Sequence, residues 1–402
     1  MVLSPLLRSA LVLGLLSAVG PFAIDMFLPA LPTIAEDLGA TIGQTQGTIT
    51  FYFVTFGLSQ LVYGPWADQA GRKLPLYIGL VIFAIASLMA TRAQSIEMLV
   101  AARALQGMGA ASLMVVTRAI VRDQYTGYEA TKLMGLIMLV FSVSPMLAPL
   151  AGAGMIAITG WRAIFAAMAV AAVLAFAITA LFQHETLPKS ERKPINLATL
   201  GRGAKVLLRD PVFMGLTFVG GLAMSGFFIF IASASFVYVE TFGLTPTQFS
   251  LAFTINAMGF IGASQTAAPL MRRYGAMTII LTGVIGFATV MCTLFALSLL
   301  GYASFPVIVI GLIAGFASVG LVMPTTMVAA LDPHGEIAGL ASSLGGTLQM
   351  VAGGAMVALT GQFFDGSPTP MLGAMAFCAI LNLALILTVQ GRARRALSGD
   401  MA

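Results

Sequence analysis

The sequence predicts an all-α polytopic membrane protein with about twelve transmembrane helices, and three observations lead to this fold class. Hydrophobic residues make up 59% of the 402 residues and charged residues only 9%, whereas a soluble domain has about 25% charged residues. Apolar runs of about 20 residues, the length that crosses a bilayer core, recur along the whole chain. Lys and Arg collect in alternate loops between these runs, the pattern that the positive-inside rule describes.

Cutting the chain at its polar and turn-rich stretches gives the individual helices. The first apolar run follows Arg8 and could be mistaken for a signal peptide, but it continues past Asp25 to Leu31. That length exceeds the apolar core of a cleaved segment, so we expect a retained first helix. The predicted spans are 9–30, 44–66, 74–92, 97–119, 131–154, 162–183, 211–239, 247–270, 276–298, 304–330, 338–361 and 370–390.

The loop charges orient the helices. Most of the 20 Lys and Arg residues fall on one side if both termini are cytoplasmic. The longest polar stretch lies at the midpoint of the chain. We therefore expect two six-helix halves with both termini cytoplasmic: an N-terminal bundle at 1–183, a cytoplasmic linker at 184–210 and a C-terminal bundle at 211–402.

A short internal repeat supports two related halves. Pro65 is followed by Gly71 after the second span, and Pro269 by Gly275 after the eighth, so both residues recur 204 positions later (65 to 269, 71 to 275). Parallel halves of this kind recur among transporters. The second copy lacks the acidic residue of the first, which indicates that the halves differ in role.

Several classes of function find no support in the sequence. There is no phosphate-binding Gly-Lys-Ser/Thr loop, and neither His184 nor His334 belongs to a ligand cluster. Cys292 and Cys378 lie within apolar runs and are expected to pack rather than form a disulfide. We expect no cofactor, metal or nucleic acid. The expected partners are the lipid bilayer, protons and a small-molecule substrate, with the protein acting as a monomer.

Asp25 and Arg103 are the charged residues that fall clearly inside predicted spans. A charge at membrane depth costs about 2.5–3.5 kcal/mol even on insertion scales, so each needs a partner or a wet cavity. Counting 1.5 Å per residue puts both in the same layer, about 21–24 Å from the cytoplasmic side, so contact is possible. Proton coupling is one interpretation; a static buried ion pair that fixes helix register is the other.

The loop after the second span reads Gly64-Pro-Trp-Ala-Asp68-Gln-Ala-Gly71-Arg72-Lys73. It resembles the signature Gly-x-x-x-Asp-Arg-x-Gly-Arg-Arg/Lys of the major facilitator superfamily, with Gln in place of the first Arg, and the resemblance implies the major facilitator fold. The resemblance implies a gating role for Asp68, whose carboxylate would cap the helix that begins near Ala338. Gly64, Gly71, Arg72 and Arg118 are the other expected members of this gate. The alternative is that these charges only set topology.

Two further segments resemble motifs of the same superfamily. Arg103-Ala-Leu-Gln106-Gly-Met-Gly in the fourth span matches Arg-x-x-Gln-Gly-x-Gly. Pro145, Pro149 and Gly152 in the fifth span resemble a degenerate form of the motif common in antiporters, in which Gly and Pro bend and thin the helix; Ala148 stands where that motif has Gly. Ordinary packing of small residues would also explain this second match.

The first span reads Asp25-Met-Phe-Leu-Pro-Ala, and it resembles the Asp-Met-Tyr-Leu-Pro-Ala signature of the bicyclomycin/chloramphenicol-resistance (Bcr/CflA) family of drug:proton antiporters. Trp161-Arg162 and Glu185-Thr-Leu fit the same family. The resemblance is detailed in the N-terminal half. It implies a multi-pass protein of the bacterial inner membrane that exports small drugs in exchange for protons. The single acid of the first span favours neutral or weakly polar drugs over cations.

Two alternatives remain open. A major facilitator protein that exports or imports a metabolite would have the same fold. A membrane-embedded enzyme would need paired carboxylates, a His cluster or a nucleophile with its base at membrane depth, and a single intramembrane Asp does not supply one.

Substrate contacts are proposed for aromatic and polar residues on helices that line the central cavity in this superfamily, although ordinary packing explains any one of them better. The candidates are Phe22, Tyr52, Gln106, Phe227, Phe228, Asn256 and Gln349.

Overall fold

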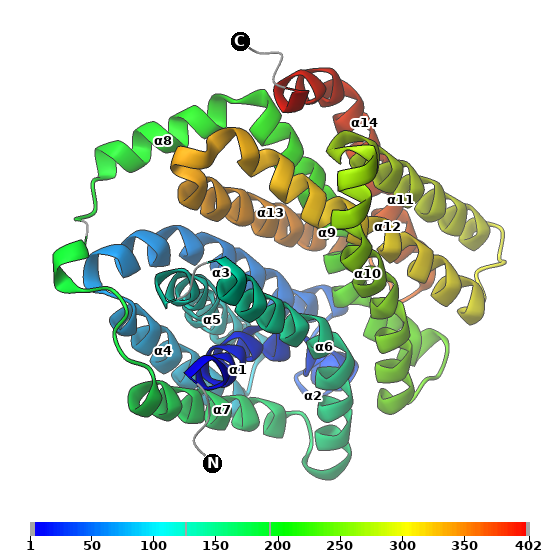
Figure 1. Cartoon of the computed structure of the whole chain (residues 1–402). Helices are drawn as coiled ribbons and strands as arrows, with labels where there is room; N and C mark the ends of the chain where they lie inside the picture. Colours follow the sequence, from blue (N-terminus) through cyan, green and yellow to red (C-terminus); the bar gives the residue numbers. More distant parts are fainter. Residues whose placement is uncertain (1–4, 125–126, 193, 399–402) are drawn as a thin grey trace. The chain divides into compact units, whose positions relative to one another are not determined.

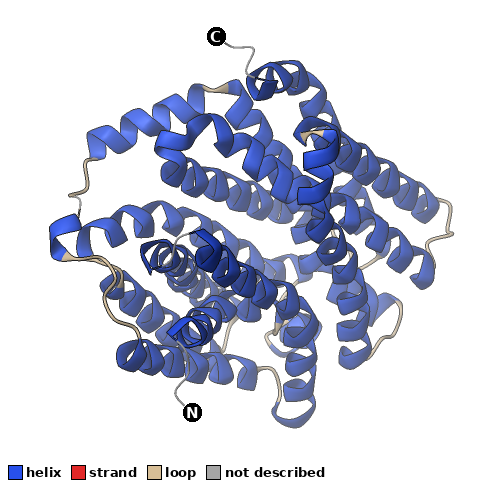
Figure 2. Ribbon diagram, in the orientation of Figure 1, coloured by secondary structure: helices blue, strands red, loops and turns tan. Residues whose placement is uncertain are grey.

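The computed structural model describes the backbone of residues 5–124, 127–192 and 194–398. Side-chain surroundings are described for the same residues except 5–11, 127–132, 134–142, 197 and 393–398. Within these ranges the regular structure is entirely helical (Figure 2). The predicted all-α fold with twelve long helices is confirmed. The long helices are α1 (Pro5–Asp25), α3 (Ile42–Ala70), α4 (Lys73–Thr91), α5 (Ile96–Gln124), α6 (Gly127–Thr159), α7 (Arg162–Phe182), α9 (Pro211–Phe236), α10 (Pro246–Tyr274), α11 (Ala276–Leu299), α12 (Phe305–Leu331), α13 (Ala338–Gly361) and α14 (Pro368–Ser398) (Figure 1).

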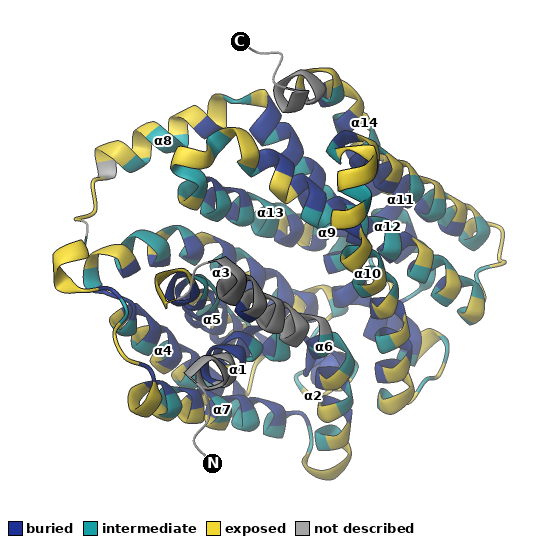
Figure 3. Ribbon diagram, in the orientation of Figure 1, coloured by how far each residue is buried: buried dark blue, intermediate teal, exposed yellow. Residues whose placement is uncertain are grey.

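The chain forms two compact units, unit 1 (Met1–Asn196) and unit 2 (Leu197–Ala402). In unit 1, α5 packs against α3 and α4, α7 against α4, and α6 against α1. In unit 2, α12 packs against α10 and α11, α14 against α11, and α13 against α9. Taken in chain order, these are the same pairings, so the internal repeat extends from one loop to the arrangement of each bundle. In Figure 3, α9 is mostly dark blue, because its neighbours α12, α13 and α14 enclose it.

The repeat is also visible in how α3 and α10 begin and end. Each helix has 29 residues and starts with a capping box, in which a Thr hydroxyl accepts from the backbone of a Gln that in turn accepts from the Thr N–H. The pairs are Thr41 with Gln44 and Thr245 with Gln248. Each helix also ends at a glycine with positive φ, Gly71 (91°) and Gly275 (83°).

The prediction of one continuous first helix was wrong. The helix α1 ends at Asp25, a turn and a short 3₁₀ segment (η1, Leu28–Ala30) follow, and a second helix, α2, runs from Leu31 to Asp37. Pro29 and Pro32 lie at this break. Proline has no N–H for the i−4 hydrogen bond and its ring clashes with the preceding turn, which is why the helix cannot continue.

The segment predicted as a linker contains a helix. Helix α8 (Leu197–Arg209) follows a short 3₁₀ turn (η2, Lys189–Glu191) and belongs to unit 2. Its Leu207 is fully buried, whereas Val206, Leu208 and the basic residues of the helix are exposed (yellow in Figure 3). A 13-residue helix is about 20 Å long at 1.5 Å per residue, so half of the expected linker is a stiff element.

Eight segments of the described residues are long and apolar enough to cross a membrane, judged by length and composition. One of these segments, Phe305–Gly361, holds both α12 and α13. Helices α3 and α10 do not qualify, because Gln, Thr, Ser and Asn side chains interrupt their apolar runs. The two helices that correspond in the internal repeat therefore share this interruption by polar side chains.

The matched glycines give a test of the local geometry. A Cβ at Gly71 would lie 2.6 Å from the Arg192 Nη2 and Glu185 Oε2 atoms, whereas a Cβ at Gly275 would meet nothing within 4 Å. Alanine at either position adopts a backbone conformation that costs about 1–3 kcal/mol. We expect Gly71→Ala to lower the thermal unfolding midpoint of the purified protein clearly more than Gly275→Ala. Equal shifts would contradict the packing described at Gly71.

Candidate functional site

Arg103 is fully buried on α5 and lies between two aromatic rings. Its Cζ atom is 4.2 Å from the ring centre of Phe27 and 4.4 Å from that of Tyr52. Its Nη1 donates to the Ala23 carbonyl oxygen at 2.9 Å and to Gln106 Oε1 at 2.8 Å. Ala23 lies in the last turn of α1, where carbonyls have no helical partner. The cation therefore faces the negative end of the α1 dipole and two ring faces.

Gln106 holds Arg103 in place from the same helix. Its Nε2 donates to Ser87 Oγ at 2.7 Å, and Ser87 Oγ donates to the Phe83 carbonyl on α4. Because Gln106 Oε1 accepts from Arg103, the amide has partners on both sides. Tyr52 is anchored similarly, with its hydroxyl donating to the Gly20 carbonyl at 3.2 Å.

The glycines after Gln106 allow α5 to approach its neighbours. A Cβ at Gly107 would collide with the Tyr52 carbonyl of α3, and a Cβ at Gly109 would lie 2.5 Å from the Gly79 carbonyl of α4. These two positions therefore need residues without a side chain. The motif Arg103-x-x-Gln106-Gly-x-Gly thus combines a buried cation, its holder and two close helix contacts.

Asp25, the last residue of α1, is 5% exposed. Its Oδ2 accepts a long hydrogen bond of 3.4 Å from Ser144 Oγ on α6. Among the ion pairs of the described residues, none joins Asp25 to Arg103. The direct contact expected from their equal depth is therefore not formed, because Arg103 donates to the carbonyl two residues earlier. The partner found for the carboxylate is an uncharged hydroxyl.

The antiporter-like segment of α6 adjoins the same break in the first helix. Gly152 is buried, and a Cβ there would collide with the Met26 carbonyl oxygen directly after Asp25. Pro145 and Pro149 lie inside α6, and Pro145 directly follows Ser144. The structure thus brings Asp25, Arg103 and this segment together around the end of α1.

The predicted gate residues lie in a charge cluster at the ends of α3, α4 and α5. Arg72 Nη1 contacts Asp68 Oδ1 at 2.6 Å, and Arg72 Nε contacts Asp123 Oδ2 at 2.7 Å. Gly71 adjoins the cluster, whereas a Cβ at Gly64 would meet nothing within 4 Å. Arg118 is half-buried on α5, and no contact of Arg118 is among those described for the cluster. The capping of the α13 start by Asp68 stays a prediction.

Glu185, just after α7, closes this cluster. Its carboxylate accepts from the backbone N–H groups of Arg72 (2.9 Å) and Lys73 (3.2 Å). Burial would raise the pKa of Glu185, but these donors, the N–H of Leu187 and the charge of Arg192 outweigh it and hold the pKa below its ordinary value. The carboxylate is therefore charged at neutral pH and ties the end of unit 1 to the turn at Gly71.

Sequence reasoning missed Asp123, Glu185 and Ser144 as members of these sites. Counting only Lys and Arg in loops left out the acids that pair with them. Asp123 directly follows Arg122 at the end of α5, and that position was the available signal. Ser144 precedes Pro145, but one hydroxyl in an apolar span carries little information by itself.

The predicted substrate residues divide between the two units. Phe22 of unit 1 is partly exposed, whereas Tyr52 and Gln106 are buried and support Arg103. In unit 2, Phe227 is partly exposed and stacks on Phe260 with ring centres 5.9 Å apart. The other three are Phe228, which is buried; Asn256, whose Nδ2 donates to the Tyr238 hydroxyl at 2.8 Å; and Gln349, whose Nε2 donates to the Thr217 carbonyl at 3.4 Å.

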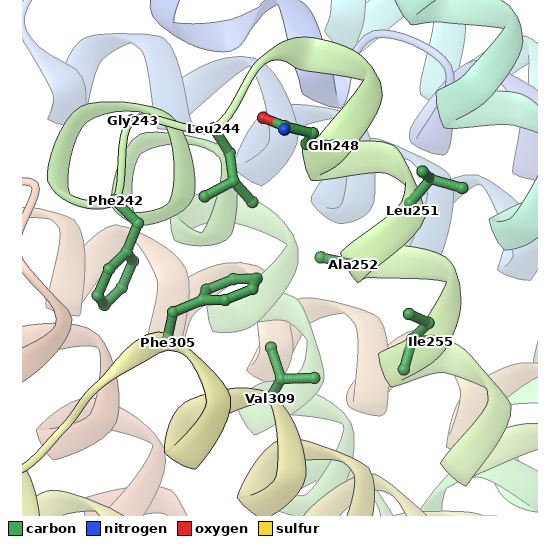
Figure 4. Close-up of a pocket in the computed structure, with 9 residues that line it drawn as sticks. All are labelled: Phe242, Gly243, Leu244, Gln248, Leu251, Ala252, Ile255, Phe305 and Val309. Atoms are coloured by element: carbon green, nitrogen blue, oxygen red, sulfur yellow. The ribbon is translucent and has the colours of Figure 1, made fainter.

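Unit 2 also has an apolar hollow of about 490 Å³ where α10 and α12 begin (Figure 4). None of the predicted substrate residues lines it. Its walls are Phe242, Gly243, Leu244, Gln248, Leu251, Ala252, Ile255, Phe305 and Val309.

The comparisons with known proteins agree on the family. Residues 13–358 match the profile described as Major Facilitator Superfamily. The chain is 32% identical over 382 residues to an uncharacterized MFS-type transporter, YdgK, of Bacillus subtilis, covering 94% of each chain. It is 30% identical over 374 residues to the bicyclomycin resistance protein homolog of Haemophilus influenzae, covering 93% of this chain and 94% of the relative.

Solved structures support the fold. The crystal structure of the human organic anion transporter MFSD10 (TETRAN) superposes with a TM-score of 0.69 at 18% identity, covering 96% of this chain and all of the other. At that identity the likeness concerns the fold alone. The profile match and the bacterial relatives make the chain a multi-pass membrane protein and a secondary transporter, not an enzyme.

The contact between α6 and the helix break gives a testable pair of variants. Gly152→Ala would insert a methyl group against the Met26 carbonyl, whereas a Cβ at Gly154 meets nothing within 4 Å. We expect Gly152→Ala to cost about 1–3 kcal/mol of stability from overpacking and Gly154→Ala to be close to neutral. The thermal unfolding of both purified variants measures this. Unchanged stability of Gly152→Ala would contradict the contact.

Proposed function

The chain belongs to the Major Facilitator Superfamily, and on that premise we propose that it is a proton-coupled exporter of small, uncharged or weakly polar drugs in the bacterial inner membrane. The observation that carries the proposal is Asp25, an acid at membrane depth whose described partner is a hydroxyl rather than a cation. The similarity to a bicyclomycin resistance protein homolog supports drug as the cargo and the Bcr/CflA family as the branch.

Asp25 and Arg103 divide the work of coupling in this proposal. An ionised carboxylate is costly at membrane depth unless it is paired or wetted, while the protonated form carries no such cost. Asp25 takes up a proton when its side of the protein faces the outside, and releases it when water from the cytoplasm reaches the break in the first helix. Arg103 keeps that break intact through its hydrogen bond to Ala23.

Drug and proton are then exchanged because the proton binds the charged carboxylate of Asp25, whereas the drug favours a different protonation state of that carboxylate. A substrate that enters beside the break displaces the packing around Arg103 and Phe27, which changes the surroundings of the carboxylate two residues away. Only a difference in affinity between two conformations can couple the two movements. The two-unit architecture with repeated pairings suits alternating access.

The gate of this proposal is the charge cluster at Arg72. Asp68 is the most exposed member, with 56% of its side chain accessible, and it is available to a second partner while it contacts Arg72. The resemblance to the superfamily signature points to the N-terminus of α13 as that partner, where a carboxylate gains about 0.3–1 kcal/mol or more from the helix dipole.

Neutralising Asp25 tests the coupling. We expect Asp25→Asn to abolish proton-driven drug uptake into inverted vesicles, down to the level of vesicles without the protein, because the amide cannot exchange a proton. Asp37→Asn is the matched control, since Asp37 lies on α2 and is paired with Arg162 at 2.7 Å. If Asp25→Asn is present in normal amounts and still takes up drug in response to the proton gradient, Asp25 is not the proton-coupling residue.

Replacing Arg103 tests its supporting role. Lysine has the charge but lacks the flat guanidinium that fits between two rings. We expect Arg103→Lys to reduce proton-driven uptake and to lower thermal stability together, because the helix break loses its support. Wild-type stability and transport in Arg103→Lys would contradict the supporting role described for Arg103.

The cargo decides between a drug exporter and a metabolite transporter of the same fold. Expression in an exporter-deficient bacterium should raise resistance to neutral antibiotics if the proposal holds. An unchanged resistance profile, with proton flux in proteoliposomes triggered by a metabolite instead, would select the alternative.

A further inference from the structure

His334 lies in the short 3₁₀ segment η4 (Asp332–Ile337), which connects α12 to α13 within unit 2. Its Nε2 atom is 2.8 Å from Asp210 Oδ2, and the two side chains are 13% and 24% exposed. The ring also meets Phe213 on α9 edge to face, with ring centres 5.6 Å apart and planes at 87°. Two contacts therefore fix one loop residue to the start of α9.

Asp210 is the single residue between α8, which ends at Arg209, and α9, which begins at Pro211. Its Oδ1 accepts from the Val212 N–H at 2.8 Å and so caps α9. Its Oδ2 holds His334. One carboxylate thus connects three elements: the linker helix, the first long helix of unit 2 and the loop before α13.

We propose that His334 and Asp210 form a second proton-responsive site, a latch that tightens on protonation of His334 and slows turnover. Histidine is the side chain whose charge changes between about pH 5 and 8. When neutral, the ring donates a hydrogen bond to the Asp210 carboxylate; when protonated, it adds its own positive charge, so the contact becomes a salt bridge between opposite charges and is stronger.

Other charged groups lie on η4 and on the helices packed against η4 and the start of α9. Among the described side chains, the last turn of α12 and the first turn of α13 contain no ionisable group. The charged groups are Asp210 at the start of α9, Asp332 and Glu336 on η4, Arg202, Lys205 and Arg209 on α8, and Arg392 on α14.

The latch has a direct consequence for α13. Because η4 ends where α13 begins, the start of α13 cannot move away from α9 while His334 is bound to Asp210. The positive-inside rule puts this end of unit 2 in the cytoplasm. The effect on transport rests on the proposed function: imported protons would acidify the compartment that the latch faces and so slow further exchange.

Amide hydrogen exchange tests the latch without any assumption about transport. We expect the protection of the Gly335, Glu336 and Ile337 amides to rise about fivefold when the pH is lowered from 8 to 6, after correction for the intrinsic pH dependence of exchange. The rise is the gain expected when a partly exposed ring adds its charge to the contact with Asp210. His334→Gln should remove this rise, and His184→Gln, which changes an exposed histidine of unit 1, should keep it.

Asp210→Asn provides a second variant if His334→Gln does not fold, since Asn also caps helices but lacks the charge. It should likewise abolish the pH response. A flat protection profile in the wild type, or the same rise in either variant, would overturn the latch.

Transport measurements distinguish failure of the latch from failure of the proposed function. At a fixed proton gradient, lowering the pH on the linker side from 7.5 to 6.5 should slow the wild type more than His334→Gln. Equal slowing would overturn the regulatory role. Absence of any proton-driven transport, with the exchange response intact, would overturn the proposed function and leave the latch.

Discussion

The hydrogen bond from Arg103 to the Ala23 carbonyl is the interaction on which the candidate site depends. It satisfies a carbonyl that the interrupted first helix leaves without a helical partner, and it places a fixed positive charge beside that helix end. Two aromatic rings and the Gln106 amide then hold the guanidinium. This arrangement leaves the Asp25 carboxylate without a cationic partner among the ion pairs of the described residues, which suits the proton exchange proposed for it.

Unit 1 combines two kinds of polar site with different surroundings. At membrane depth, Asp25 and Arg103 are almost fully excluded from solvent, and their neighbours are rings, amides and hydroxyls. At the end of α3, the Arg72 cluster has three acids and two basic residues in direct contact. The first type of site takes up and releases the proton in the function proposed above, whereas the charges of the second are paired with one another.

The sequence alone was sufficient for the fold class and for the two buried charges. Length and apolarity define membrane helices nearly independently of tertiary context, and Asp25 and Arg103 stood out because charges are rare in such runs. The break after Asp25 was missed although Pro29 and Pro32 were visible, since prolines are tolerated in membrane helices when neighbours satisfy the freed groups. Whether Arg103 meets a carboxylate or a carbonyl depends on side-chain direction, which spacing along a helix does not reveal.

Gly152 and Met26 add a mechanical consequence. Their contact joins a glycine to a backbone carbonyl, so no flexible side chain lies between α6 and the end of α1 to absorb a displacement. Rotation of one helix relative to the other would separate or collide main chains. During a transport cycle, the end of α1 and the part of α6 around Gly152 should therefore move together, and the bending needed to open a pathway must come from other segments.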